Sequence, residues 1–238
     1  MANICPTECY VNGLAQTYRP LGCFEEIMTQ ITQAQIQSWE RFYRGHFINS
    51  LSGYKSGSLI GTVSPEGQSN LAIFSNLVHI GADPALIGFV NRPREAAPHT
   101  LANIEATGFY TVNHIHESMI ALAHQTSAKY PATVSEFEAV GLTALWRDGF
   151  RAPYVAESVV QYGMKLVEVI PIQHNGTFFV IGSVVEVWLN ENYLEADGFI
   201  DLEKAGSVAT LGIDGYYRAQ RLQRFAYAKP GQAVKVIS

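Results

Sequence analysis

Arg92 lies between a predicted strand and a predicted helix, at a place where a phosphate site can form. The strand ends in Gly88-Phe89-Val90-Asn91, and the helix covers residues 100–107 with Thr100 as its expected N-cap. A guanidinium, a capping hydroxyl and the free amides of a helix N-terminus together bind phosphate, and His99 adds a further donor. A solvated arginine beside a purely structural cap would give the same pattern, so the residues alone leave both interpretations open.

A second polar segment, Ser69-Asn70-Leu71-Ala72-Ile73-Phe74-Ser75-Asn76, follows the turn Pro65-Glu66-Gly67-Gln68. Alternate residues of a strand face the same way, so Asn70, Ala72 and Phe74 share one face. Small side chains here would let a flat ring approach the backbone, whose amides can then bond the polar edge of the ring. An ordinary half-buried strand would have a similar composition.

Histidines form a third group. His114 and His116 are two apart on a predicted strand and would face the same way, and His124 follows, which raises the possibility of a metal site. No carboxylate or thiolate stands at a suitable spacing, so hydrogen-bonded or surface histidines are the default interpretation. The loop from Thr126 to Tyr130, which contains Lys129, could cover a ligand.

Motifs of several other chemistries are absent. The chain has no G-x-G-x-x-G, no G-x-x-x-x-G-K-[ST], no G-x-S-x-G, no H-E-x-x-H and no paired C-x-x-C. Near the end, Leu211 to Tyr217 combines glycines with aromatics, as either a surface turn or a lid over a ring would. If the protein is an enzyme, the difficult chemistry should therefore belong to a bound cofactor.

Strands dominate the elements that must position these residues. Turn residues and apolar runs predict strands at residues 58–64, 69–75, 85–90, 109–113, 159–172 and 177–189. Asn175-Gly176 predicts a hairpin between the last two, because both residues tolerate a positive φ. Without a regular alternation of strands and long helices, the pattern favours an antiparallel barrel over a doubly wound sheet.

Short helices are predicted between the strands. The helix of residues 100–107 would end at Gly108, a second covers 117–124, and Ser135 with Glu138 has the spacing of a capping box. From Phe24 a helical pattern runs to an expected end at Gly45. The chain therefore divides into an N-terminal arm with a helix, residues 1–45, and a main domain, residues 46–238.

Composition limits the partners. The 238 residues are 47% hydrophobic and only 16% charged, so much surface is buried in an oligomer or taken up by a large cofactor. The net charge of −5 argues against a general nucleic-acid binder. With no signal peptide and no apolar stretch long enough to span a bilayer, we expect a soluble, cytoplasmic protein without a membrane partner.

The ordered series of segments resembles the flavin reductase-like proteins, a family with an FMN-binding split barrel that also includes flavoredoxin. The resemblance runs from about residue 50 to 217 and is carried by the order and spacing of the series. Its segments are Leu59–Val63, Gly67–Asn76, Asp83–Phe89, His99–Ile104, Gly108–Asn113, Ser135–Phe137, Val180–Val185 and Asp197–Asp201. It implies a mainly β fold, an antiparallel, Greek-key-like FMN-binding split barrel with short decorating helices and a helical N-terminal arm.

The resemblance also implies a set of cofactor-binding residues. Backbone groups of Asn70, Leu71 and Ala72 would line the flavin ring, and Ser75 and Asn76 would lie beside the ribityl chain or phosphate. Phosphate would be held by Arg92, His99 and Thr100, although Pro98-His99-Thr100 stands where the family often has Lys-Asp-Thr. Phe89, in a matching segment, and Thr126 and Lys129, in the loop that would approach the ring, complete the set; no metal ligand is expected.

The implied activity is hydride transfer from NADH or NADPH to N5 of FMN, followed by electron transfer to flavin or another small-molecule or protein acceptor. No side-chain catalyst is needed for that step. The main alternative is a flavoredoxin-like FMN carrier without NAD(P)H activity, and more distant ones are a metalloprotein using the histidines and a purely structural interaction domain. Members of the family are usually homodimers with FMN near the interface, which agrees with the low charge content.

Overall fold

The computed structural model describes residues 10–11, 14–15 and 28–237. The chain forms two compact units, one of residues 41–219 and one of residues 1–40 together with 220–238. All of the barrel elements belong to the first unit. The division of the chain into an arm of residues 1–45 and a main domain of residues 46–238 stays a prediction. Within the described ranges, no helix is long and apolar enough to cross a membrane.

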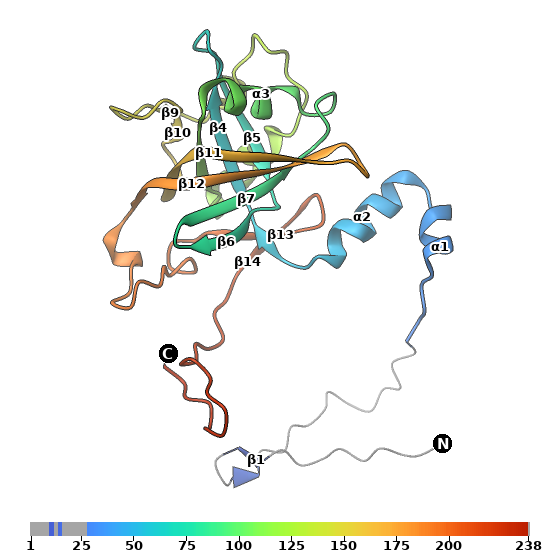
Figure 1. The fold of residues 1–238 in the computed structure, drawn as a ribbon, viewed down its shortest axis with the longest axis vertical. Coiled ribbons are helices and arrows are strands. Elements are labelled where there is room, and N and C mark those ends of the chain that lie inside the picture. Colours follow the sequence, from blue (N-terminus) through green and yellow to red (C-terminus); the bar gives the residue numbers. More distant parts are fainter. Residues whose placement is uncertain (1–9, 12–13, 16–27, 238) are drawn as a thin grey trace. The chain divides into compact units, whose positions relative to one another are not determined.

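The fold is mainly β, as the sequence predicts, and is dominated by a seven-stranded antiparallel sheet (Figure 1). In the order in which they pair, its strands are β5 (Ser69–Phe74), β4 (Ser58–Val63), β8 (Phe109–His114), β11 (Val160–Ile172), β12 (Thr177–Leu189), β7 (Ala85–Asn91) and β6 (Val78–Ala82). The sheet thus has β5 and β6 at its ends, and β5 pairs only with β4.

Smaller pairings complete the strands. A three-stranded sheet joins β14 (Gly215–Arg218), β13 (Val208–Leu211) and β3 (Lys55–Ser56). Two short pairs, β9 (Ala144–Leu145) with β10 (Tyr154–Val155) and β1 (Tyr10–Val11) with β2 (Leu14–Ala15), stand apart from the larger sheets.

The core lies on both faces of β5, and the alternation predicted for that strand is confirmed. Leu71 and Ile73 pack into one apolar cluster with residues of the helices that follow β8. Phe74 packs into the other cluster, where Phe89 is 1% exposed. Because both faces of β5 are covered, a shift of one residue would exchange the two sets of side chains. Packing therefore fixes the register of the strand and with it the position of Asn70.

The helix α3 (Pro98–Thr107) begins earlier than predicted. Its N-cap is Ala97, and Pro98 occupies the first helical position, where the missing N–H of proline is no loss. The expectation that Thr100 caps this helix is therefore wrong, and Thr100 lies inside the first turn. Gly108 ends the helix with a φ of 77°, as predicted.

The helical pattern before the barrel forms two helices, α1 (Gln33–Ser38) and α2 (Arg41–Leu51). Gly45 lies within α2, so the predicted end at this residue is wrong; the interruption comes instead at Trp39, whose backbone is extended. The predicted start at Phe24 lies outside the described residues.

The region after β8 holds the 3-10 helix η1 (Glu117–Met119), then α4 (Ile120–Gln125) and α5 (Glu136–Val140); a second 3-10 helix, η2 (Glu191–Tyr193), follows β12. Ser135 is the N-cap residue of α5 but makes no capping bond, so the predicted capping box is wrong. Its hydroxyl instead lies 2.8 Å from that of Ser69, because α5 packs beside β5. Between β11 and β12 the turn covers residues 173–176, two residues longer than the predicted hairpin loop.

Candidate functional site

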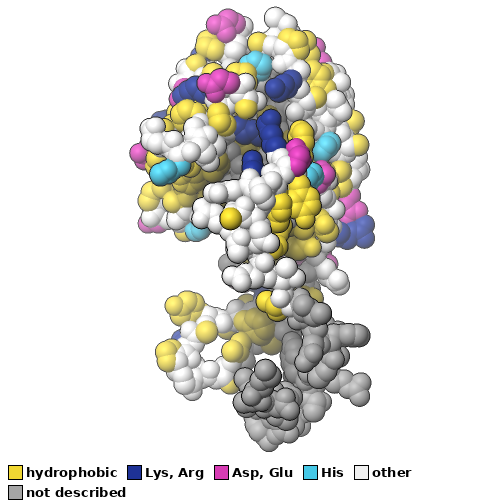
Figure 2. Space-filling model, turned by 90° about the vertical axis from the view of Figure 1, so that its right-hand side faces the viewer, with side chains coloured by type: hydrophobic (Ala, Val, Ile, Leu, Met, Phe, Trp, Pro, Cys, Tyr) yellow, Lys and Arg dark blue, Asp and Glu magenta, His cyan; other side chains and the backbone are white. Residues whose placement is uncertain are grey.

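A cavity of about 520 Å³ lies beside β5, within the size range of small-molecule sites. Its wall is formed by β5, the end of β7, the N-terminal turn of α3, the segment between α4 and α5, and the turn between β13 and β14. Figure 2 shows a hollow on this side of the molecule, with Lys and Arg side chains in it. A smaller cavity of about 320 Å³ shares Asn70, His99 and Ala132 with the first.

The structure brings together nine of the eleven residues predicted to bind a cofactor. These residues line the larger cavity: Asn70, Ala72, Ser75, Asn76, Arg92, His99, Thr100, Thr126 and Lys129. The other two, Leu71 and Phe89, are buried in the two core clusters. Leu71 was predicted to contribute backbone groups, and its N–H is already bonded to Glu136. Phe89 was chosen as part of a matching segment, and its side chain lies in the core.

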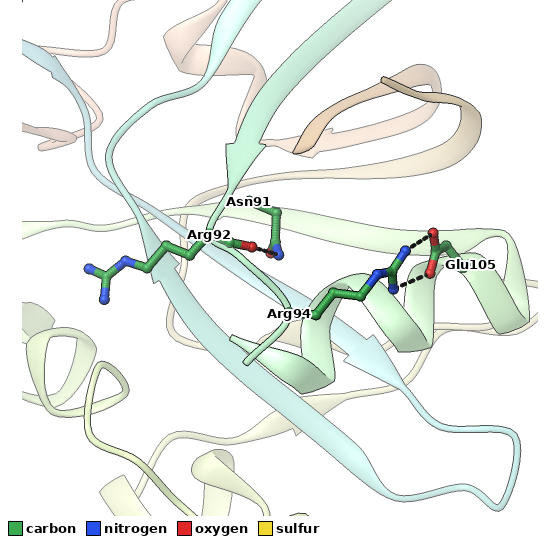
Figure 3. A network of polar contacts seen from close by, with 4 residues as sticks. All are labelled: Asn91, Arg92, Arg94 and Glu105. Atoms are coloured by element: carbon green, nitrogen blue, oxygen red, sulfur yellow. Dashed lines mark hydrogen bonds and ion pairs between the residues drawn. The ribbon is translucent and has the colours of Figure 1, made fainter. Parts of the chain in front are cut away.

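Arg92 and Lys129 are the cations of the cavity wall. Both side chains are exposed, and neither forms a hydrogen bond or ion pair with any part of the chain that the structure describes. Figure 3 shows the guanidinium of Arg92 pointing away from Arg94, which pairs with Glu105 of α3. The cavity therefore has two positive charges that are free to meet an anion.

The first turn of α3 adds backbone donors to the same cavity. The N–H of Ala97 donates to the carbonyl of Pro93 over 3.1 Å, and Pro98 has no N–H. Of the four amides that a helix leaves free at its start, those of His99 and Thr100 remain without an acceptor among the described residues. Together with Arg92, which lines the same cavity, they are electropositive groups suited to a phosphate.

Thr100 is held by a buried polar network. Asn70 donates its side-chain amide to the hydroxyls of Thr100, at 3.2 Å, and Thr62, at 3.3 Å. Asn103 donates to the same Thr62 hydroxyl over 3.1 Å. Because the Thr100 oxygen accepts from Asn70, its own hydrogen stays available for an acceptor in the cavity.

The backbone of β5 is open on the cavity side, since the strand pairs only with β4. On this open edge the N–H of Leu71 donates to the carboxylate of Glu136 over 3.0 Å. N–H groups point to the same edge at every second residue of a strand, so that of Ile73 also faces outward. Ile73 lines the cavity, and its amide is suited to bond the polar edge of a flat ring.

Two of the predicted residues have partly structural roles. The side-chain amide of Asn76 accepts from the N–H of Val90 at 3.2 Å and donates to its carbonyl at 2.8 Å, and so ties β5 to β7. The hydroxyl of Thr126 donates to the carbonyl of Ala123 and ends α4. By contrast, the half-buried Ser75 makes no hydrogen bond through its hydroxyl with a described residue, so this hydroxyl is available to a ligand.

The turn between β13 and β14 also lines the cavity. The hydroxyl of Tyr216 lies 2.9 Å from Nδ1 of His124, and both residues line the cavity. Burial raises the pKa of Tyr216 above its usual range, helped by the charge of Asp214. This pair connects the turn to α4.

The three histidines considered for a metal point to separate partners. His114 contacts the Ser207 hydroxyl at 3.1 Å, His116 contacts the Glu157 carbonyl at 2.8 Å, and His124 contacts Tyr216. Burial lowers the pKa of His114 to about 4. In the part of the chain that is described, no group of three His, Cys, Asp or Glu residues is placed to hold a metal ion.

Sequence reasoning missed Glu136, Asn49 and Ile73 as wall residues. Glu136 stands in a segment that carries the resemblance, but nothing in that segment indicated that its side chain lines a binding site. Asn49 comes from α2, where the helical pattern does not show which element the helix approaches. Ile73 contributes through its backbone, which no side-chain pattern reports.

Comparisons with known proteins place this geometry in a family. Residues 51–206 match the sequence model of the flavin reductase like domain. A crystal structure from Shewanella frigidimarina, described as a candidate flavin reductase with a split barrel domain, is 46% identical with a TM-score of 0.81, covering 84% of this chain and 100% of that one. An uncharacterized protein of Halalkalibacterium halodurans is 31% identical over 165 residues, 67% of this chain and 78% of its own.

More distant structures share the fold. Flavoredoxin of Desulfovibrio vulgaris is 22% identical with a TM-score of 0.63, and the alignment covers 76% of this chain and 93% of that one. At this identity the likeness concerns the fold alone, and here that fold is the split barrel.

Proposed function

Because the chain belongs to the flavin reductase like family, we propose that it binds FMN in the cavity beside β5 and acts as an NAD(P)H-dependent flavin oxidoreductase. One observation carries the proposal. Arg92, Lys129 and the two free amides at the start of α3 converge on a single cavity, and none has an anionic partner among the described residues. A phosphate monoester supplies the charge that this arrangement lacks.

The residues present fit the cofactor. Arg92 and Lys129 would hold the phosphate by charge, and the amides of His99 and Thr100 with the Thr100 hydroxyl would orient it. The open edge of β5, with Ala72 and the N–H of Ile73, would contact the ring. Ser75, which also lines the cavity, has a free hydroxyl that would bond the polar chain joining the ring and the phosphate.

FMN would supply the hydride and electron chemistry when bound. The chain's own residues would position the ring, exclude water and set the charge around it. Tyr216 and His124 would contribute a further part of the wall around the cofactor, and the open part of the cavity would leave room for the donor or acceptor. This division of labour agrees with a sequence that has no catalytic triad or metal motif.

We also propose that the protein is a homodimer that passes electrons to a small-molecule or protein acceptor. Large apolar side chains are exposed on the two longest strands, β11 and β12, which is unusual for a free surface. They are Val167, Ile170, Val185, Val187 and Trp188. Whether the cavity lies near that interface and whether the protein is cytoplasmic stay predictions.

The experiment is an anaerobic reduction of the FMN-loaded protein, followed by its visible absorbance. Bleaching by NADH or NADPH, with turnover when flavin or an artificial acceptor is added, is the expected result. A flavin spectrum that stays oxidised would contradict the reductase activity and leave an FMN carrier served by another protein. A protein that takes up no FMN would contradict the proposal as a whole.

A further inference from the structure

One carboxylate of the cavity wall differs from the others. Glu95, Glu136 and Asp214 all line the cavity, but Glu95 and Asp214 are exposed whereas Glu136 is 6% exposed. A buried carboxylate near a bound ring interacts with it through a medium of lower dielectric than water. Its charge therefore has more influence than that of the two exposed acids.

Glu136 is fixed in place by the strand that would contact the ring. Its Oε2 accepts the N–H of Leu71 over 3.0 Å, and the adjacent residues Ser135 and Ser69 bring their hydroxyls within 2.8 Å of each other. The start of α5 thus takes the place of a neighbouring strand along part of β5. Leu71 lies between Asn70 and Ala72, so the carboxylate is held at the same open edge of β5 as the expected ring contacts.

The surroundings balance the charge of Glu136 without pairing it. Burial raises the pKa of its carboxyl above the usual range, while the Leu71 N–H, its own backbone and His99 act in the opposite direction. Of the elements packed against α5, β5 carries no titratable side chain and α4 contributes His124. The other charged or titratable groups that face the same cavity are Arg92, Glu95, Lys129, Tyr130, Asp214 and Tyr216.

We propose that Glu136 tunes the redox behaviour of the site, its charge lowering the reduction potential of FMN bound in the cavity and its protonation relieving that effect. The inference rests on the proposed FMN site and adds a named residue to it. A fixed negative charge repels the electrons that reduction adds, so it favours the oxidised cofactor. Glu136 acts through its field and contributes no bond to the transferred hydride.

The test is an equilibrium redox titration of the FMN-loaded protein, in the wild type and in Glu136→Gln. Glutamine keeps an oxygen that can accept the Leu71 N–H, so the edge of β5 stays capped while the charge is lost. We expect Glu136→Gln to bind reduced relative to oxidised FMN about tenfold more tightly than the wild type. For a two-electron couple this is a rise in potential of about 30 mV.

Glu138→Gln is the matched control, because Glu138 is exposed on the same helix and does not line the cavity. Its potential should equal that of the wild type. As the pH falls through the titration of Glu136, the wild-type potential should rise above the value set by the flavin itself. Glu136→Gln should lack this additional rise.

A purely structural role for Glu136 predicts a different pattern. In that case Glu136→Gln and Glu138→Gln would both match the wild type, and only Glu136→Ala, which removes the cap, would change the potential. That result would overturn the inference and leave the FMN site intact. If FMN binds and the predicted shift is found but NAD(P)H does not reduce it, the inference stands and the reductase activity fails; if FMN does not bind, both fail.

Discussion

Arg92 and Arg94 lie two residues apart beyond the end of β7, yet they are placed in opposite ways (Figure 3). Arg94 forms two hydrogen bonds of 2.7 Å with the carboxylate of Glu105, and its guanidinium lies 4.7 Å from the centre of the Phe178 ring. Arg92 points away from that pair and lines the cavity without a partner in the described residues. One arginine is satisfied by the fold, and the other has its charge available.

The two arginines therefore differ in what they contribute, Arg94 to the stability of the fold and Arg92 to the binding of a ligand. An exposed ion pair such as that of Arg94 contributes only about 0–1 kcal/mol to folding, and it leaves no charge for a ligand. A cation without a partner contributes little to the folded state but can form a charge-assisted bond with an incoming phosphate. The four changes below test whether the chain follows this division, in order of decreasing expected effect.

Arg92→Ala should weaken FMN binding by about 1.5–3 kcal/mol, or roughly ten- to 150-fold, because a charge-assisted contact with the phosphate is lost. Equilibrium titrations with FMN and with riboflavin measure the effect. Riboflavin, which lacks the phosphate, should bind the variant as it binds the wild type. Unchanged FMN affinity would remove Arg92 from the site.

Asn70→Ala should lower the free energy of unfolding by about 1–3 kcal/mol, since it removes two buried hydrogen bonds. The Thr100 hydroxyl then loses its donor, whereas that of Thr62 keeps the one from Asn103. Denaturant unfolding of the flavin-free protein measures this loss. The same variant should weaken FMN more than riboflavin, because the Thr100 hydroxyl that Asn70 holds would orient the phosphate, which riboflavin lacks. Stability equal to that of the wild type would show that the polar wall is not preorganised by this network.

Lys129→Ala should weaken FMN binding by about 1 kcal/mol, a smaller effect than that of Arg92→Ala. An ammonium on a flexible, exposed chain is held less rigidly than a planar guanidinium. Raising the salt concentration should reduce the difference between wild type and variant, because exposed charges are screened. A loss as large as that of Arg92→Ala would show that the lysine is the principal phosphate ligand.

Arg94→Ala should change FMN affinity less than twofold and stability by less than about 1 kcal/mol. It is the matched control for Arg92→Ala, since the two variants remove the same side chain from neighbouring positions. Parallel titrations and unfolding curves check both expectations. If Arg94→Ala weakened FMN as much as Arg92→Ala does, the distinction between the two arginines would be wrong.

The sequence predicted the barrel well because its strands are marked locally. Alternating side chains, the turn at Pro65–Gln68 and Gly108 after α3 depend on neighbours in the chain, and the structure has each of them. The helix starts were less accurate. Pro98 can occupy the first turn as readily as it can precede it, so the local pattern could not decide where α3 begins.

The cavity depended on contacts far apart in sequence. Asn70 meets Thr100 across 30 residues and Leu71 meets Glu136 across 65, and no local pattern reports such distances. The resemblance to a family nevertheless predicted eleven binding residues, of which nine line the cavity. It did so because residues that share a binding site in a family keep their positions in the fold. It could not separate Arg92 from Arg94 by partner, nor show that the side chains of Leu71 and Phe89 turn into the core.

The phosphate site is tested most directly by a titration of the flavin-free protein with FMN and, in parallel, with riboflavin. We expect one FMN to bind per chain and riboflavin to bind more weakly by at least the factor lost in Arg92→Ala, because the phosphate meets the free cations and amides. Equal affinity for the two flavins would contradict the phosphate site. No binding of either would contradict the proposal that the cavity beside β5 holds FMN.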